Sequence, residues 1–87
     1  MWFYVYILRL NSGKHYVGCT SDLNGRIKRH LKGYVPATKQ HLPVGLIWCC
    51  SFPEKHRAFE FELYLKSGSG RSFAKKHLLK KTPISNV

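Results

Sequence analysis

Polar side chains that could do chemistry are concentrated in residues 15–30, HYVGCTSDLNGRIKRH. Arg26 and His30 are four residues apart in a segment whose pattern predicts a helix, so they share one helix face. An arginine beside the apolar stripe of such a helix can bind a phosphate through two parallel hydrogen bonds. The alternative is a generic solvated basic face, because Lys28 and Arg29 are close by.

Glu62 is a second candidate, because it is a carboxylate within an apolar stripe. Four residues three or four positions away on the predicted helix 54–66 surround it, most of them apolar: Ala58, Phe59, Leu65 and Lys66. Glu60, by contrast, has charged and polar neighbours, which predicts a solvated carboxylate. An inward-facing carboxylate is costly unless it is paired or binds a metal. Periodicity therefore leaves two interpretations of Glu62 open, an ion pair such as one with Lys66, or a metal ligand.

Two further features have both an ordinary and a functional interpretation. Tyr6 and Tyr16 are typical core aromatics, and a phenol, which titrates near pH ~10, becomes a base only if cations or a metal lower its pKa. Residues 67–71, SGSGR, are either a flexible turn between helices or an anion-binding loop at a helix start.

Hydrophobic patterning predicts the elements that position these residues. Strands are expected at 2–10, 15–19 and 44–52, and helices from a Thr20-Ser21-Asp22 cap to Gly33, then at 54–66 and 71–81. If the 11–14 turn pairs residues whose numbers have an even sum, Tyr16 joins Tyr6 on one sheet face. The order β-β-α-β-α-α predicts a single α+β domain over 1–82 with a tail at 83–87.

Composition bounds the partners of the chain. The 87 residues carry 15 Lys+Arg against 4 Asp+Glu, a net charge of +11 spread over the whole sequence, which favours nucleic acid as partner over a mere solubility device. Cys19, Cys49 and Cys50 are odd in number and lack CxxC spacing, which indicates reduced thiols in a cytoplasmic protein without a zinc site. Neither a signal peptide nor a membrane-spanning segment is expected.

The ordered set of tyrosines, arginine, histidine and glutamate resembles the GIY-YIG nuclease domain, in its short UvrC-like branch. Tyr4-Val5-Tyr6 stands where the family has Gly-Ile-Tyr, and Tyr16-Val17-Gly18 stands where it has Tyr-Ile-Gly. The family's helix arginine, its frequent histidine and its metal-binding glutamate fall on Arg26, His30 and Glu62. The resemblance spans residues 3–80, and it departs from the motif chiefly where Tyr4 replaces glycine.

This resemblance implies a small three-stranded antiparallel sheet flanked by helices, and a metal-dependent DNA endonuclease active in repair, recombination or a mobile element. Glu62 would hold Mg²⁺ or Mn²⁺, Tyr6 would be a phenolate base, and Arg26 would neutralise the transition-state phosphate. Tyr16 and His30 would orient water and substrate in a single pocket with Tyr6 and Glu62, left open because Gly18 ends its strand.

The partners follow from the same resemblance. Four cations are candidates for the DNA track: Lys39, Arg71, Lys75 and Lys76. A monomer is expected, with a protein partner that could direct it to its target. Two alternatives stay open, a non-catalytic nucleic-acid-binding module of the same fold and a structural protein of a ribonucleoprotein.

Overall fold

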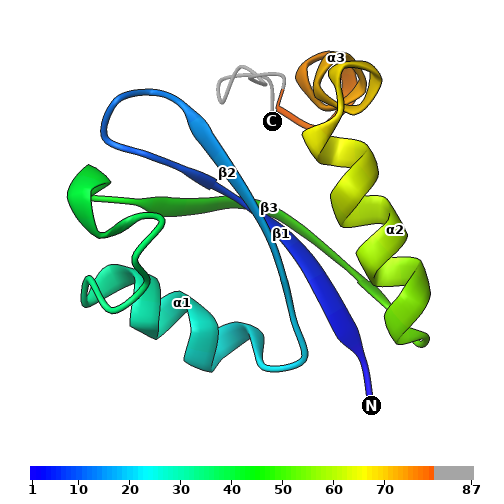
Figure 1. The fold of residues 1–87 in the computed structure, drawn as a ribbon, viewed down its shortest axis with the longest axis horizontal. Coiled ribbons are helices and arrows are strands. Elements are labelled where there is room, and N and C mark those ends of the chain that lie inside the picture. Colours follow the sequence, from blue (N-terminus) through cyan, green and yellow to red (C-terminus); the bar gives the residue numbers. More distant parts are fainter. Residues whose placement is uncertain (80–87) are drawn as a thin grey trace, which may run out of the picture.

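A three-stranded antiparallel sheet forms the centre of the molecule (Figure 1). The computed structural model describes residues 1–79. Strands β1 (Phe3–Arg9), β2 (His15–Thr20) and β3 (Gly45–Phe52) lie in the order β2-β1-β3, so β1 is central and β2 has a free edge. The predicted α+β class and the order β-β-α-β-α-α are confirmed. Residues 80–81 of the third predicted helix and the tail at 83–87 lie outside the described residues.

The register of the β1–β2 hairpin fixes which side chains share a sheet face. Tyr6 is paired with Gly18, and Leu8 with Tyr16, so paired residue numbers have an even sum. Successive residues of a strand point to opposite faces. The prediction that Tyr6 and Tyr16 share one face is therefore confirmed.

Helix α1 (Leu23–Leu31) covers the face of the sheet that carries Tyr6. The side chain of Asp22 caps it, with Oδ1 accepting a hydrogen bond from the amide of Gly25 at 3.1 Å, as the capping cluster predicts. One core cluster results, formed by apolar residues of the sheet, α1 and the segment before β3: Tyr6, Leu8, Leu10, Val44, Tyr16, Leu23, Ile27 and Leu42.

Helices α2 (Lys55–Lys66) and α3 (Gly68–His77) cover the opposite face, as Figure 1 shows. Three buried residues of these helices, Ala58, Leu65 and Ala74, share a core cluster with the odd-numbered β1 residues Val5 and Ile7. The stripe expected around Glu62 is thus correct for Ala58 and Leu65. It is wrong for Phe59, whose side chain is exposed.

Two segments differ from the prediction. Helix α3 begins at Gly68, not at Arg71, because the Ser67 side chain accepts a hydrogen bond from the Gly70 amide (3.1 Å) and caps it. A side chain at Gly70 would overlap the backbone of Tyr64, so glycine allows the close α2–α3 contact. Between the first predicted helix, which ends at Gly33, and the third predicted strand, residues Lys39–His41 form a short 3₁₀ helix, η1.

Candidate active site

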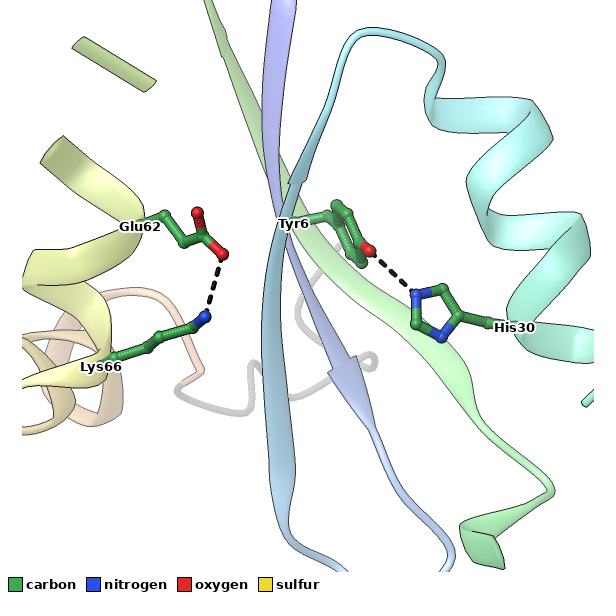
Figure 2. A network of polar contacts seen from close by, with 4 residues as sticks. All are labelled: Tyr6, His30, Glu62 and Lys66. Atoms are coloured by element: carbon green, nitrogen blue, oxygen red, sulfur yellow. Dashed lines mark hydrogen bonds and ion pairs between the residues drawn. The ribbon is translucent and has the colours of Figure 1, made fainter. Parts of the chain in front are cut away.

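Three side chains on the α1 side of the sheet are linked to one another by hydrogen bonds. The Tyr6 hydroxyl lies 2.8 Å from Nε2 of His30, and Nδ1 of His30 lies 2.7 Å from the hydroxyl of Thr38 (Figure 2 shows the first contact). Tyr6 comes from β1, His30 from the last turn of α1, and Thr38 from the turn before η1. All three side chains are almost completely buried. A hydrogen-bonded polar network inside a core fixes the orientation of its members.

Tyr16 completes an aromatic cluster with this pair. Its ring centroid lies 5.2 Å from that of His30 and 6.4 Å from that of Tyr6. Unlike Tyr6, it is only partly buried. Of the two motif tyrosines, Tyr16 is therefore the one that solvent reaches more readily.

Burial controls the protonation of the Tyr6–His30 pair. Desolvation raises the pKa of Tyr6 above its usual value, and the negative charge that Tyr16 and Glu62 carry when ionised adds to this, against the opposing charge of Arg26. Desolvation and Arg26 lower the pKa of His30, which favours a neutral imidazole. The expectation that Tyr6 stands ready as a phenolate is not supported, because nearby positive charge does not outweigh its burial.

Gly18 explains how the phenol of Tyr6 fits against β2. A Cβ atom at this position would overlap the phenol end of the Tyr6 ring. The expectation that Gly18 ends its strand is wrong, because β2 continues to Thr20. The absent side chain makes room for the Tyr6 ring within the strand.

Arg26 lies on α1, one turn before His30, and is partly buried. Its charge acts on both members of the buried pair, since it lowers the pKa of Tyr6 and that of His30. The structure therefore brings four of the five predicted catalytic residues to one side of the sheet: Tyr6, Tyr16, Arg26 and His30.

Glu62 is held in an ion pair on the other side of the sheet. Its Oε2 accepts a hydrogen bond from Nζ of Lys66 at 2.9 Å, and its side chain is 14% exposed. This pair is one of the two interpretations that the sequence left open for Glu62, and Glu60 is exposed as predicted.

The ligands available at Glu62 fit only an ion that needs few protein ligands. Within residues 1–79, no three His, Cys, Asp or Glu side chains come together as a cation site. Mg²⁺ and Mn²⁺ sites can rely on few protein ligands, because Mg²⁺ keeps several of its waters and takes one or two carboxylates. Glu62 provides a single carboxylate, and only its Oε2 atom is bonded to Lys66. Its second oxygen therefore suits such an ion.

The structure does not place all five residues in one pocket. Figure 2 shows Glu62 and Tyr6 on opposite sides of the strands, with the Tyr6 ring pointing toward His30. Desolvation raises the pKa of Tyr6 and that of Cys19, and the charge of Glu62 adds to both shifts. The expected single pocket is wrong in this respect, since α1 and α2 pack on different faces of the sheet.

A basic groove of about 760 Å³ lies on the α2–α3 side of the sheet, across β2 from this cluster. Its floor is apolar, and Tyr16 borders it where β2 passes, although the Tyr16 ring lies on the α1 side of the sheet. Five basic side chains line it: Lys14, His15, Lys66, Arg71 and Lys75. None of the described residues that line the groove is acidic, although Lys66 is paired with Glu62. Such a surface suits a phosphate backbone.

The four cations predicted for DNA contact are not all together. Arg71 and Lys75 line the groove, whereas Lys76 is exposed on α3 outside it. Lys39 is exposed on η1, which follows Thr38 on the α1 side of the sheet. Sequence reasoning missed Lys14, His15 and Lys66, which only the hairpin and the α2–α3 corner bring to Arg71.

Sequence reasoning also missed Thr38. It lies in a segment that reads as a polar loop, and no spacing links it to His30, eight residues earlier.

Two other sequence expectations, on the cysteines and on membrane spans, can be compared with the structure. Cys19, Cys49 and Cys50 are free thiols. None of the helices in residues 1–79 has the length and apolar content needed to cross a membrane.

Known proteins of similar sequence support a common fold. The chain is 36% identical over 85 residues to the UPF0213 protein BH0048 of Halalkalibacterium halodurans, covering 97% of this chain and 90% of the relative. It is 39% identical to a UPF0213 protein of Pediococcus pentosaceus, covering 95% and 86% of the two chains. A solution NMR structure of BH0048, attributed to Bacillus halodurans, matches with a TM-score of 0.59 over 95% of this chain and 89% of that chain.

The family assignment rests on almost the whole described chain. Residues 2–77 match the family described as "GIY-YIG catalytic domain", a span that includes every one of the five candidate catalytic residues. The matching NMR structure has 36% sequence identity, so shared sequence and shared fold agree. The chain therefore belongs to the GIY-YIG nuclease family.

Proposed function

We propose that this protein is a divalent-metal-dependent DNA endonuclease that hydrolyses phosphodiester bonds at particular DNA structures, in repair, in recombination or in a mobile element. The observation that carries the proposal is the cluster of Tyr6, Tyr16 and His30 around Gly18, beside Arg26, with a basic groove on the other side of β2. Membership of a nuclease family supports the same reaction.

The groove would bind the DNA backbone on one side of the scissile phosphate. Arg71, Lys75 and Lys14 lie around an apolar floor and supply charge without base recognition. Arg26 would neutralise the charge that develops on the phosphate in the transition state. Because Tyr16 is only partly buried and its ring touches the buried pair, it would contact the attacking water and is our candidate base.

Tyr6 and His30 would act as a neutral pair. The buried phenol is bound to the imidazole and would position Tyr16 and the water near it. Glu62 would hold Mg²⁺ or Mn²⁺, which when bound stabilises negative charge on the leaving 3′ oxygen. Lys66 would then release the carboxylate or share it, since one Glu62 oxygen is already bonded to its ammonium group.

One observation favours a second function, a nucleic-acid-binding module without catalysis. The Glu62–Lys66 ion pair satisfies the carboxylate without any metal. On this alternative, the basic groove would bind DNA, and the cluster around Tyr6 would serve only the fold.

The experiment that separates the two functions uses the full chain and labelled single-stranded, duplex, flap and branched DNA. Each DNA is incubated with EDTA, Mg²⁺ or Mn²⁺, and binding is measured at the same salt concentration. Our proposal predicts nicking only with metal, and a Glu62→Ala variant that binds DNA without cutting it. Binding without cleavage of any substrate under all conditions would overturn it in favour of the binding module.

A further inference from the structure

Thr38 and His30 are the only polar residues among 1–79 that are fully buried, and they are bonded to each other. The Thr38 hydroxyl is 2.7 Å from Nδ1 of His30, and it makes no capping bond to η1, whose N-cap position it occupies. The Thr38 hydroxyl therefore serves the buried His30 ring and not the turn in which it lies.

The backbone around Thr38 holds this hydroxyl in place. The amides of Thr38 and Lys39 both donate to the carbonyl of Val35, at 3.0 and 2.9 Å. The amide of His41 donates to the carbonyl of Thr38 at 2.9 Å. The turn is thus closed on both sides of Thr38, and its side chain points into the core with little freedom to move.

The proton arrangement of the three groups follows from their chemistry. A neutral imidazole has one N–H donor and one bare nitrogen, so one of its two hydroxyl partners donates and the other accepts. A phenol is a stronger acid than an aliphatic alcohol, and it is therefore the better donor. For these two contacts, of 2.8 and 2.7 Å, we therefore expect the Tyr6 O–H to donate to Nε2 of His30 and Nδ1–H of His30 to donate to the Thr38 oxygen.

We infer that Thr38 is a positioning residue that holds His30 in the Nδ1–H tautomer, with Nε2 free to accept the Tyr6 hydroxyl. The group on the second ring nitrogen of a functional histidine generally decides its tautomer. Without the Thr38 oxygen, Nδ1–H loses its acceptor, and the imidazole is free to present Nε2–H to Tyr6 instead. The Tyr6 hydroxyl would then turn away from His30.

The test is an NMR measurement on the full ¹⁵N-labelled chain, in which two-bond proton–nitrogen correlations identify the protonated ring nitrogen of each histidine. In the wild type, His30 is expected to carry its proton on Nδ1. Thr38→Val should shift population to the Nε2–H tautomer, and Thr38→Ser, which keeps the hydroxyl, should restore the wild-type pattern. Val35→Ala removes buried side-chain packing from the same turn but keeps the Thr38 hydroxyl and the Val35 carbonyl, and should leave the tautomer unchanged.

A wild-type His30 protonated on Nε2 would overturn the inference, as would a Thr38→Val protein with an unchanged tautomer. The consequence for catalysis rests on the proposed function. Thr38→Val should lower the metal-dependent nicking rate about tenfold or more, and Thr38→Ser should recover it. If the wild type does not cut DNA at all, the proposed function fails while the tautomer result still decides the role of Thr38.

Discussion

Glu62 and Tyr6 approach the same stretch of β2 from opposite faces of the sheet (Figure 2). The Tyr6 phenol lies against Gly18, and the charge of Glu62 acts on the thiol of the next residue, Cys19. Because β2 is an edge strand, both faces meet at its free edge. On the proposed function, a substrate lying along this edge would reach groups from α1 and from α2.

Changing Tyr6 and Tyr16 to phenylalanine, one at a time, should affect stability and activity differently. Tyr6→Phe leaves the buried Nε2 of His30 without its partner and should destabilise the fold by about 1–3 kcal/mol. Tyr16→Phe should cost less than about 0.5 kcal/mol but reduce nicking about a hundredfold. Urea unfolding and a plasmid-nicking assay measure the two effects. Wild-type cleavage by Tyr16→Phe would rule out Tyr16 as the base.

Gly18→Ala should disturb the site through packing alone. The added methyl group overlaps the Tyr6 ring, and we expect a loss of about 1–3 kcal/mol in the free energy of unfolding. Gly45→Ala is the matched control, because a Cβ atom there meets no neighbour within 4 Å. If both variants were equally stable in urea, the close Tyr6–Gly18 contact would be wrong.

Stability should fall as the pH is lowered through the range in which an unfolded histidine titrates. The pKa of His30 is lowered in the folded state, so near and below pH ~6.5 the unfolded chain binds a proton that the folded chain does not. The free energy of unfolding should therefore decrease from pH ~7.5 to pH ~5.5.

His30→Gln should reduce this pH dependence, as measured by urea unfolding at the two pH values. His15→Gln provides the comparison: desolvation, Arg9 and Lys75 also lower the pKa of His15, but its side chain is exposed, so this change should reduce the pH dependence less than His30→Gln does. The same pH dependence in wild type and His30→Gln would show that His30 is not held neutral by its surroundings.

The groove should account for the salt dependence of DNA binding. Arg71→Ala and Lys75→Ala should each weaken binding and reduce the slope of log affinity against log salt by about 1. Lys76→Ala, on the same helix but outside the groove, should change the slope less. Fluorescence anisotropy at several salt concentrations measures these slopes. Equal effects of Lys75→Ala and Lys76→Ala would argue for diffuse binding over the whole helix.

Much of the fold could be predicted from local patterns. Strand alternation and the Asp22 cap placed β1, β2 and α1, and the even register correctly joined Tyr6 to Tyr16. The start of α3 was missed because capping by Ser67 outweighs the two glycines that read as a helix break.

The site was less predictable, since its remaining features depend on which helix covers which face. Periodicity placed Glu62 inward but could not tell that α2 lies across the sheet from α1. Burial of Tyr6 depends on the glycine opposite it in the hairpin, and a motif match carries no information on pKa. Thr38 reaches His30 only through the turn before η1, which has no signature in the sequence.

The most direct test of metal-dependent cleavage compares Glu62→Gln with Glu60→Gln. Both changes remove one negative charge from α2, but only Glu62 lies near β2 and the Tyr6 phenol, while Glu60 is exposed. The measurement is the Mg²⁺- or Mn²⁺-dependent nicking rate at DNA concentrations that saturate binding. We predict that Glu62→Gln lowers this rate at least about a hundredfold with DNA affinity retained, and that Glu60→Gln cuts like the wild type. Equal rates for the two variants would contradict the role of Glu62 as the metal ligand.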